Sequence, residues 1–509
     1  MARQPSAWII ALLTAGMVLA VYYLLGQSAS SALLALRPAE VAEGDQEIAW
    51  FNPATNSYAW TRFLAGLMEL RARHPELGLQ LDVKSSLGEE SATLPAVGLR
   101  RDGYKGTLWL RWYKLTGQQG TREWLEQLLR RAPPPLAIVG GGSSDRARDL
   151  ALALSQARLP PADAPLLLFT NATADGVVVD GKTTELLSLN PERSFRFCFS
   201  NRQMAAMILD FIWHEPSHRP TDGCAYLLAW KDDPYSVDLV TQFRERLSPP
   251  PERTSRASTE DPPPQEVKRV WERVVPYSMG RVHEPNEREA IAVQDLLQDL
   301  AEGDEQERAL LVLPGEAKQA RRVLRALFRA APTAARRFVA TVGDSVGFNA
   351  IYRDRRAQWA IQDQPCPLVM FCHRNPVSGE AGFVEELAAA SRPDAASTST
   401  DDLLIYSDVA GALLAAAYSD SALLSAPQKL RDRMRAGSAM QAQFDAAGNR
   451  RPGTGEYIVL LEPKWAGERV LPQARISVFA RDQQAGSWVL HRRIDVDYAP
   501  HPPAAPSPE

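Results

Sequence analysis

Short apolar runs alternate with amphipathic stretches along most of this chain. Residues 136–139 (LAIV) form one such run, which is followed by a turn of small residues at 140–144 (GGGSS) and by a helical pattern over 145–157. Residues 165–169 (PLLLF) form a second run, followed by the polar turn 170–173 (TNAT). Each run has the length and continuous hydrophobicity of a buried parallel strand. The two segments therefore predict two strand-to-turn units of an α/β sheet.

The same alternation extends over two halves of the chain. Predicted strands cover residues 47–51, 107–113, 224–230, 270–275, 309–313, 338–342, 368–371, 456–462, 475–480 and 488–496. Predicted helices cover residues 58–73, 121–131, 203–214, 237–247, 289–300, 316–330, 382–390 and 403–418. Residues 74–106 have weak periodicity, which is typical of an insertion. Strands that alternate with helices in two series predict an α/β fold of two doubly wound lobes, each built on a parallel sheet.

An uncharged apolar stretch at residues 8–25 follows Arg3 near the start of the chain. Its length is at the lower limit for a membrane-spanning helix and exceeds the core of most signal peptides. Small residues at 28–32 offer a site for a signal peptidase. We expect a single transmembrane anchor, or a signal segment if it is cleaved, and then a linker over 26–44. Both alternatives place the rest of the chain outside the cytoplasm, in the periplasm.

Composition narrows the expected partners. The 509 residues carry a formal net charge of −4 and show no Lys/Arg stripe interleaved with aromatic residues, so nucleic acid is not an expected partner. The four cysteines contain no C-x-x-C pair, and buried free thiols are favoured over a disulfide. Residues 248–265 and 498–509 are rich in proline, and they are expected to form an exposed insertion and a disordered tail.

Two turns of this chain carry hydroxyl groups where a ligand is expected. The carboxyl ends of parallel strands line the ligand-binding crevice of an open α/β sheet. Ser143, Ser144 and Thr173 follow two such ends. Their hydroxyl and backbone N–H groups, together with the start of a helix, suit an anionic group such as a carboxylate. The alternative is that Ser143 or Ser144 only caps its helix. The two turns in tandem favour a binding cleft.

Several segments resemble, in the same order, motifs of the type I periplasmic-binding-protein family, in its branch of leucine-isoleucine-valine-binding proteins and receptor ligand-binding regions. These segments are 136–144 (LAIVGGGSS), 168–173 (LFTNAT), 195–200 (FRFCFS), 227–243 (LLAWKDDPYSVDLVTQF) and 443–449 (QFDAAGN). The resemblance spans about residues 45–465. This chain departs from the family at Ser236, where glycine is usual, and at residues 174–175 (Ala-Asp), where Asn-Pro is usual.

The resemblance implies two lobes that are joined by three crossover segments, near residues 195–200, 368–373 and 440–457. Lobe 1 is then expected to comprise residues 45–198 and 371–440, and lobe 2 residues 199–370 and 441–497. The resemblance also implies binding roles. The carboxylate and amino group of a ligand would be held on lobe 1 by Ser143, Ser144, Ala172 and Thr173. Tyr235 would close over the ligand from lobe 2, and Asp344 is a further candidate on that side.

Two short motifs of enzymes also occur. Residues 214–218 (HEPSH) match the H-E-x-x-H string of zinc proteases, but Pro216 breaks the helix that both imidazoles need, so we expect no metal there. Residues 343–347 (GDSVG) fit the nucleophile elbow of hydrolases, with Asp408 and His491 following in a suitable order. A serine hydrolase that uses Ser345 is therefore a third and less favoured hypothesis.

The favoured hypothesis is a membrane-anchored, extracytoplasmic solute-binding protein. It would capture a small amino-acid-like or carboxylate ligand between its lobes, for a transporter permease or an envelope receptor. Neither enzyme activity nor a cofactor is expected. The alternative is a degenerate binding fold that serves as a protein–protein interaction module of the cell envelope. Under this alternative, the cleft could be filled by aromatic residues of the first segment, namely Trp50, Phe51, Tyr58 and Trp60.

Overall fold

The computed structural model describes residues 37–84, 94–117, 119–160, 162–220, 224–247, 269–276, 287–301, 308–348, 361, 364–377, 400–419, 422–436, 444–453, 455–482 and 484–497. Four sequence predictions lie outside these residues: the apolar segment 8–25, the insertion 248–265, the helix 382–390 and the tail 498–509. Within the part of the chain that is described, no helix is both long and apolar enough to cross a membrane.

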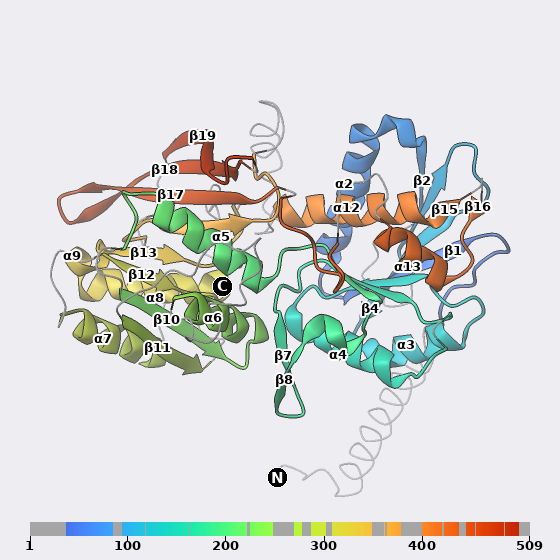
Figure 1. The fold of residues 1–509 in the computed structure, drawn as a ribbon, viewed down its shortest axis with the longest axis horizontal. Coiled ribbons are helices and arrows are strands. Elements are labelled where there is room, and N and C mark those ends of the chain that lie inside the picture. Colours follow the sequence, from blue (N-terminus) through green and yellow to red (C-terminus); the bar gives the residue numbers. More distant parts are fainter. Residues whose placement is uncertain are drawn as a thin grey trace, which may run out of the picture.

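The described residues form two lobes, each built on one large sheet (Figure 1). The first sheet has the strand order β2-β3-β4-β1-β5-β6-β9. Its strands are β1 (Gln46–Pro53), β2 (Leu79–Lys84), β3 (Ala96–Arg101), β4 (Leu108–Leu115), β5 (Ala137–Gly140), β6 (Leu166–Phe169) and β9 (Ser194–Arg196). Pairing is parallel from β4 to β9, whereas β2 and β3 run antiparallel to their neighbours. Residues 74–106, which were expected to form an insertion, supply β2 and β3 at one edge of this sheet.

Helices cover both faces of the first sheet because its central strands are apolar on both sides. Ile48 and Trp50 face α2 (Ser57–Arg73) and α12 (Thr400–Ala417), whereas Ala49 and Phe51 face the opposite side. The remaining elements of this lobe are η1 (Pro75–Leu77), α3 (Thr121–Arg130), α4 (Ser144–Gln156), the hairpin β7 (Gly176–Val179) and β8 (Lys182–Glu185), η2 (Leu186–Leu189), β15 (Tyr418–Ser419), β16 (Ala422–Leu423) and α13 (Pro427–Arg435). The late helix α12 packs against α2, so the chain returns to this lobe near its end (Figure 1).

The second sheet has the order β11-β10-β12-β13-β14-β17-β18-β19. Its strands are β10 (Cys224–Lys231), β11 (Arg269–Pro276), β12 (Ala309–Val312), β13 (Phe338–Thr341), β14 (Leu368–Cys372), β17 (Tyr457–Ala466), β18 (Arg469–Arg481) and β19 (Trp488–Asp497). The first five strands pair in parallel, and the last three are antiparallel. Both sheets are thus mixed, and the prediction of parallel sheets holds for β4, β1, β5, β6 and β9 in the first sheet and for β11, β10, β12, β13 and β14 in the second.

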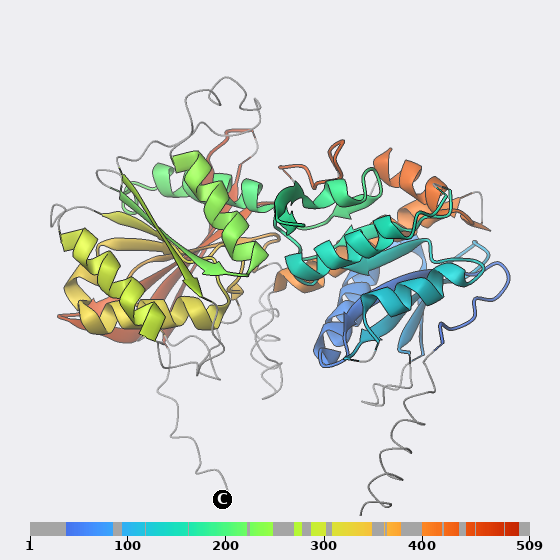
Figure 2. The same cartoon turned by 90° about the horizontal axis from the view of Figure 1, so that it is seen from below.

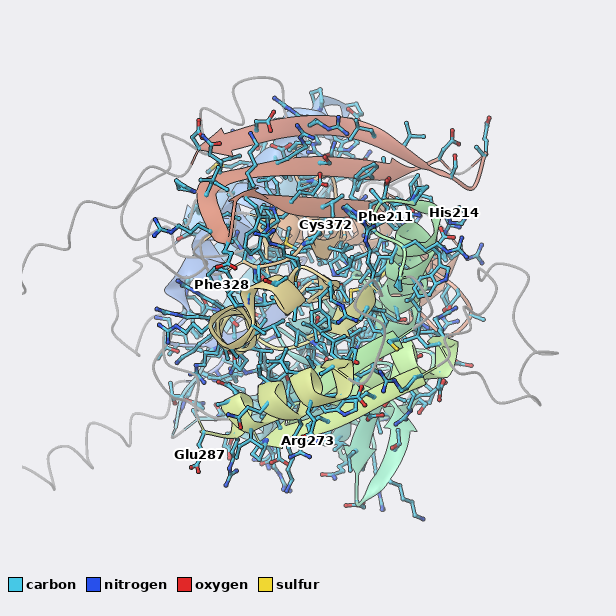
Figure 3. The ribbon with its side chains drawn as sticks, turned by 90° about the vertical axis from the view of Figure 1, so that its left-hand side faces the viewer. Phe211, His214, Arg273, Glu287, Phe328 and Cys372 are labelled. Atoms are coloured by element: carbon cyan, nitrogen blue, oxygen red, sulfur yellow. The ribbon has the colours of Figure 1, made fainter. Side chains whose placement is uncertain are left out.

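The helices of the second lobe also lie on both faces of their sheet. They are α5 (Asn201–His214), α6 (Pro234–Leu247), α7 (Glu287–Ala301), α8 (Ala317–Ala330) and α9 (Pro332–Ala335). Tyr226 packs on the side of α7 and α8, and its neighbour Leu227 packs on the side of α5 and α6. Figure 3 shows Phe211 of α5 and Phe328 of α8 on opposite sides of this lobe.

The chain passes between the two sheets three times: after β9, after β14 and before β17. Figure 2 shows the two lobes side by side from a second direction. Phe444 packs against Phe195 and Phe197 with ring centroids 5.1 Å apart in each case, and Asn449 forms a backbone bridge to Arg196. Residues 444–449 therefore lie on the first lobe, although the sequence placed 441–497 in lobe 2. Similarly, Cys372 ends β14 of the second sheet, so the return to lobe 1 begins after it.

Candidate functional site

A pocket of about 710 Å³ lies between the lobes, where the carboxyl ends of the parallel strands meet. From the first lobe it is lined by Gly142, Ser143, Ser144, Asp145, Arg146, Asn171 and Thr173. From the second lobe it is lined by Asp232, Asp233, Pro234, Tyr235, Glu316, Asp344 and Ser345. The sequence predicted Ser143, Ser144, Thr173, Tyr235 and Asp344 for one cleft, and the structure brings these five residues together in it.

The first wall begins at the amino-terminal end of α4. Ser143 occupies the position that caps this helix, but its side chain makes no capping hydrogen bond. Its Oγ atom is buried and has no hydrogen-bond partner among the described residues. The Ser144 hydroxyl accepts a hydrogen bond from the N–H of Ala174 at 3.2 Å, which ties the two turns together. Helix capping by a side chain therefore does not account for Ser143.

Thr173 continues this wall on the second turn. It is 1% exposed, and its Oγ1 atom has no hydrogen-bond partner among the described residues. Its carbonyl accepts a hydrogen bond from the Asn201 N–H at 2.7 Å, and the Arg196 guanidinium donates to the carbonyl of Ala174 at 2.7 Å. The turn is thus held through its backbone, while its hydroxyl is left for another partner.

Ala172 does not reach the cleft wall. Its side chain is fully buried and belongs to the apolar cluster on the α3 and α4 side of the first sheet. The residues on either side of it, Asn171 and Thr173, line the pocket instead. The Ala172 side chain therefore packs in the lobe, and Ala172, unlike its two neighbours, is not among the lining residues.

Tyr235 faces these hydroxyls from the second lobe. Its hydroxyl donates a hydrogen bond to the carbonyl of Val342 at 3.2 Å. Gly343 has a φ of +66°, and a Cβ atom there would lie 2.5 Å from the Tyr235 hydroxyl oxygen. Burial and the neighbouring Asp344 carboxylate raise the pKa of Tyr235 well above its usual value. Tyr235 is thus a neutral phenol, and Gly343 leaves the space that it occupies.

Asp344 is held in place by a histidine from outside the pocket lining. Its Oδ2 atom lies 2.8 Å from Nε2 of His373, whose Nδ1 atom accepts a hydrogen bond from the N–H of Phe199 at 3.0 Å. Because Nδ1 is an acceptor, a neutral His373 carries its proton on Nε2 and donates it to Asp344. His373 follows β14 and Phe199 follows β9, so the orientation of Asp344 depends on two crossover segments.

Carboxylates dominate the lining of the pocket. Among the described residues, its lining contains the acidic residues Asp145, Asp232, Asp233, Glu316 and Asp344 and one basic residue, Arg146. Asp233 accepts a hydrogen bond from the Tyr235 N–H at 3.1 Å at the start of α6. Burial, assisted by the nearby Glu316 and Asp145 carboxylates, raises the pKa of Asp233 to about 6. A lining rich in carboxylates repels an anionic ligand, whereas the sequence predicted a preference for a carboxylate.

Sequence reasoning missed most of these acids, although a signal was present. Asp232 and Asp233 directly follow strand β10, and Glu316 follows β12. The rule that selected the hydroxyls, that residues after parallel strands line the crevice, applies equally to them. His373 also directly follows a parallel strand, β14, but it acts on the site through Asp344 and does not line the pocket.

The enzyme motifs are engaged in other contacts. The Ser345 hydroxyl donates to the carbonyl of Val342 at 2.7 Å, and both ring nitrogens of His373 are taken up by Phe199 and Asp344. Asp408 pairs with Arg374, and Nε2 of His491 lies 3.2 Å from the Asn375 amide. These contacts do not form a serine triad around Ser345.

The HEPSH segment and the cysteines have structural surroundings. Helix α5 ends at His214, so the motif does not lie on one helix face. His214 contacts the Asp210 carbonyl at 2.7 Å, whereas His218 lies 3.4 Å from Glu462. In the described residues no group of three or more His, Cys, Asp or Glu side chains is arranged to hold a metal ion. All four cysteines are buried free thiols.

The aromatic residues of the first segment do not fill the cleft. Trp50 and Trp60 stack at 5.6 Å in the core of the first lobe, beside Trp112. Phe51 packs on the other face of the same sheet, against Tyr113. The side chain of Tyr58 lies outside the described residues. The expectation that aromatic residues of the first segment fill the cleft is therefore wrong for Trp50, Phe51 and Trp60.

No protein-family model matches the chain, and no curated protein matches it either. Among solved structures, the chain is similar to the branched-chain amino acid transporter substrate-binding protein LivJ from Streptococcus pneumoniae in complex with isoleucine. The two sequences are 12% identical, the match covers 84% of this chain and 97% of that chain, and the TM-score is 0.48. It is also similar to a solute-binding protein from R. palustris in complex with benzoate (14% identity, 84% and 95% covered, TM-score 0.47). A substrate-binding protein from Sphaerobacter thermophilus gives 15% identity, 89% and 98% coverage, and a TM-score of 0.49. These three proteins are solute-binding or substrate-binding proteins, the class that the sequence motifs resemble.

Proposed function

We propose that this chain binds a small solute in the cleft between its two lobes. The observation that carries the proposal is the pocket of about 710 Å³, which both lobes line and into which a buried, unpartnered hydroxyl is placed at Thr173. An unsatisfied buried polar group costs free energy, and a bound solute with a matching polar group removes that cost. The volume is in the range of small-molecule sites.

Ligand capture is proposed to proceed by a hinge motion at the three crossovers. A solute that contacts α4 on one lobe and Tyr235 on the other stabilises the closed arrangement relative to an open one. The Thr173 turn is bonded to Asn201 and braced by Arg196, both next to the first crossover. Because Asn201 begins α5 of the second lobe, this bond joins the two lobes beside the first crossover, and we propose that the hinge lies there.

The location and partner of the chain are part of the same proposal. We propose that residues 8–25 anchor it in the cell membrane, or direct its secretion to the periplasm if they are cleaved, with the lobes on the extracytoplasmic side. The support is the uncharged apolar stretch and the resemblance to binding proteins. Bound solute would pass to a transporter permease or report to an envelope receptor. The chain is proposed to carry out no catalysis.

A screen of solutes tests the binding function. The purified chain is heated with amino acids, amines, amides and short carboxylates, because a ligand that binds only the folded state raises the melting temperature. Thr173→Val, which removes the hydroxyl and keeps the shape, is expected to weaken the binding of a hit about tenfold to a hundredfold. The control is Thr333→Val, an exposed position in α9, which should bind as wild type does. If no solute of any class binds, the proposed function is wrong.

A further inference from the structure

The charge of the cleft is distributed unequally between its walls. Four of its five carboxylates belong to the second lobe: Asp232, Asp233, Glu316 and Asp344. All four follow the carboxyl ends of parallel strands, so they converge on one side of the same crevice. The guanidinium that lines the cleft in the described part of the chain, that of Arg146, lies on the first lobe. The wall formed by the second lobe therefore presents an array of negative charge to the cavity.

The opposite wall provides an independent sign that a ligand belongs here. Thr173 is 1% exposed, lines the pocket and has no partner for its Oγ1 among the described residues. The Ser143 residue lines the same pocket, and its hydroxyl is likewise unpartnered in the described part of the chain. Hydroxyls both donate and accept hydrogen bonds, so this wall suits a polar end of a solute.

The nature of the cation follows from the arrangement of the acids. In the described residues the carboxylates are not grouped as metal ligands, and the cavity of about 710 Å³ is far larger than a metal ion requires. An ammonium group offers several N–H donors, which can be shared among separated carboxylates. An organic cation, which can reach several carboxylates of a cavity of this size, therefore suits the cleft better than a metal ion does.

We propose that the solute bound in this cleft is an aliphatic amine with net positive charge, whose ammonium groups pair with carboxylates of the second lobe, which are Asp232, Asp233, Glu316 and Asp344. This inference rests on the proposed function and specifies its ligand class. A diamine, or an amino acid with a basic side chain, meets the requirement, whereas a neutral or anionic amino acid leaves the excess negative charge uncompensated.

Two features of the wall agree with this ligand. His373 donates to one oxygen of Asp344 at 2.8 Å, so this carboxylate is oriented before the ligand arrives. The raised pKa of Asp233 shows that burial and the other acids disfavour its ionised form in the empty cleft. A cation that enters the cleft offsets the repulsion between the carboxylates. It should therefore bind more tightly than it would bind to one isolated carboxylate.

Calorimetric titration of the purified full chain tests the proposal with matched solutes. The probes are putrescine and lysine as cations, leucine as a neutral amino acid of similar length, glutamate and benzoate as anions, and Mg²⁺ and Ca²⁺ as metal ions. We expect putrescine or lysine to bind at least about tenfold more tightly than leucine. The affinity of the cation should fall when the salt concentration is raised to about 0.3 M, because charges are then screened over shorter distances.

Charge-neutralising variants locate the effect. Glu316→Gln and Asp232→Asn, both on the second wall, are each expected to weaken amine binding about tenfold. Glu468→Gln is the control, since Glu468 is exposed in the turn between β17 and β18 and lies outside the pocket lining. It should bind the amine as wild type does.

The possible outcomes separate the two proposals. The proposal of a cationic amine is wrong if leucine, glutamate or benzoate binds more tightly than the amines, or if the metal ions bind and the amines do not. The proposal of a solute-binding cleft is not contradicted by these outcomes. Amine binding that is unchanged in both Glu316→Gln and Asp232→Asn also overturns the proposal of a cationic amine. If none of these probes and no solute of the wider screen binds, the proposed function itself fails.

Discussion

Asp238 of the second lobe accepts a hydrogen bond from the backbone N–H of Gly176 of the first lobe at 2.9 Å. The same carboxylate accepts from the Asp175 N–H at 2.8 Å and from the Asn201 side chain at 2.8 Å. Burial and the nearby Asp175 carboxylate raise the pKa of Asp238 above its usual value. One carboxylate on α6 thus fastens the start of the β7–β8 hairpin, and this contact links the lobes beside the first crossover.

Asp238→Asn should loosen this contact between the lobes. The two backbone N–H groups bond to different oxygens of the carboxylate, and one of these positions becomes an NH2 donor in the amide, so one N–H loses its acceptor. We expect a loss of about 1–3 kcal/mol of stability and a larger radius of gyration of the ligand-free protein in X-ray scattering. Asp149→Asn, at an exposed position on α4, is the control. An unchanged radius and melting temperature in Asp238→Asn would show that the hydrogen bonds do not restrain the lobes.

Glu47→Gln should destabilise the first lobe strongly. The Glu47 side chain is fully buried in β1, pairs with Arg111, lies 3.0 Å from Arg131, and accepts from the Tyr113 hydroxyl at 2.9 Å. Neutralising one member of a buried ionic network leaves the other charges uncompensated and costs about 3–5 kcal/mol. Glu69→Gln breaks an exposed pair with Arg73 on α2 and should cost less than about 0.5 kcal/mol. Denaturant unfolding of both variants measures the difference, and equal losses would contradict the argument.

The hydroxyl wall of the cleft could be predicted from sequence because its signal is local. Residues 136–139 and 165–169 are continuous apolar runs, and continuous apolar runs that end in small polar residues are typical of parallel strands ending at a crevice. Ser143, Ser144 and Thr173 are therefore placed by their neighbours in the chain. Ala172 shares the turn, but its side chain packs into the sheet, and which way a turn residue points is not contained in the apolar pattern.

Other parts depend on contacts that are distant in sequence. Strand β3 contains Gly98, a residue that disfavours strands, and a Cβ atom there would lie 2.8 Å from Thr107 and 3.1 Å from the Trp109 ring of β4. This close approach of β4 makes the glycine suitable, but residues 96–101 alone show no strand pattern. In the same way, His373 contributes to the site only because two crossovers bring it between Phe199 and Asp344.

Asp233→Asn should stabilise the empty protein and weaken amine binding. The pKa of Asp233 is raised from 3.8 to about 6, so the folded state favours the neutral form. The stability that this neutral form provides is present below the unfolded pKa and is lost as the pH rises from about 4 to about 6. Asparagine keeps a neutral, helix-capping side chain at every pH.

Melting curves across this pH range check the Asp233 prediction. Near pH 7, we expect the variant without ligand to melt about 2–4 °C above wild type, the shift that 1 kcal/mol produces in a domain of this size. The difference should shrink towards zero near pH 4, where Asp233 is protonated in the wild type as well. A variant that melts below wild type near pH 7, or a difference that does not vary with pH, would contradict the assigned role of burial at Asp233.

Gly343→Ala should displace Tyr235 from the cleft wall. Gly343 has a φ of +66°, and an alanine Cβ there would lie 2.5 Å from the Tyr235 hydroxyl and 2.7 Å from Leu239. Gly467 has a similar φ of +60° with nothing within 4 Å of a Cβ atom, so Gly467→Ala is a matched control for backbone strain alone. Each substitution should cost about 1–3 kcal/mol for the left-handed conformation. The clash adds a further loss of stability only in Gly343→Ala.

Ligand binding then separates strain from the displacement of Tyr235. Gly343→Ala should weaken the binding of the solute found in the screen, because the phenol that faces Thr173 is moved, whereas Gly467→Ala should leave the affinity unchanged. Tyr235→Phe removes the hydroxyl that the new methyl group would strike. Adding it to Gly343→Ala should therefore recover part of the lost melting temperature, whereas the same substitution in the Gly467→Ala background should not. If Gly343→Ala binds the solute as tightly as Gly467→Ala does, Tyr235 does not form part of the binding wall.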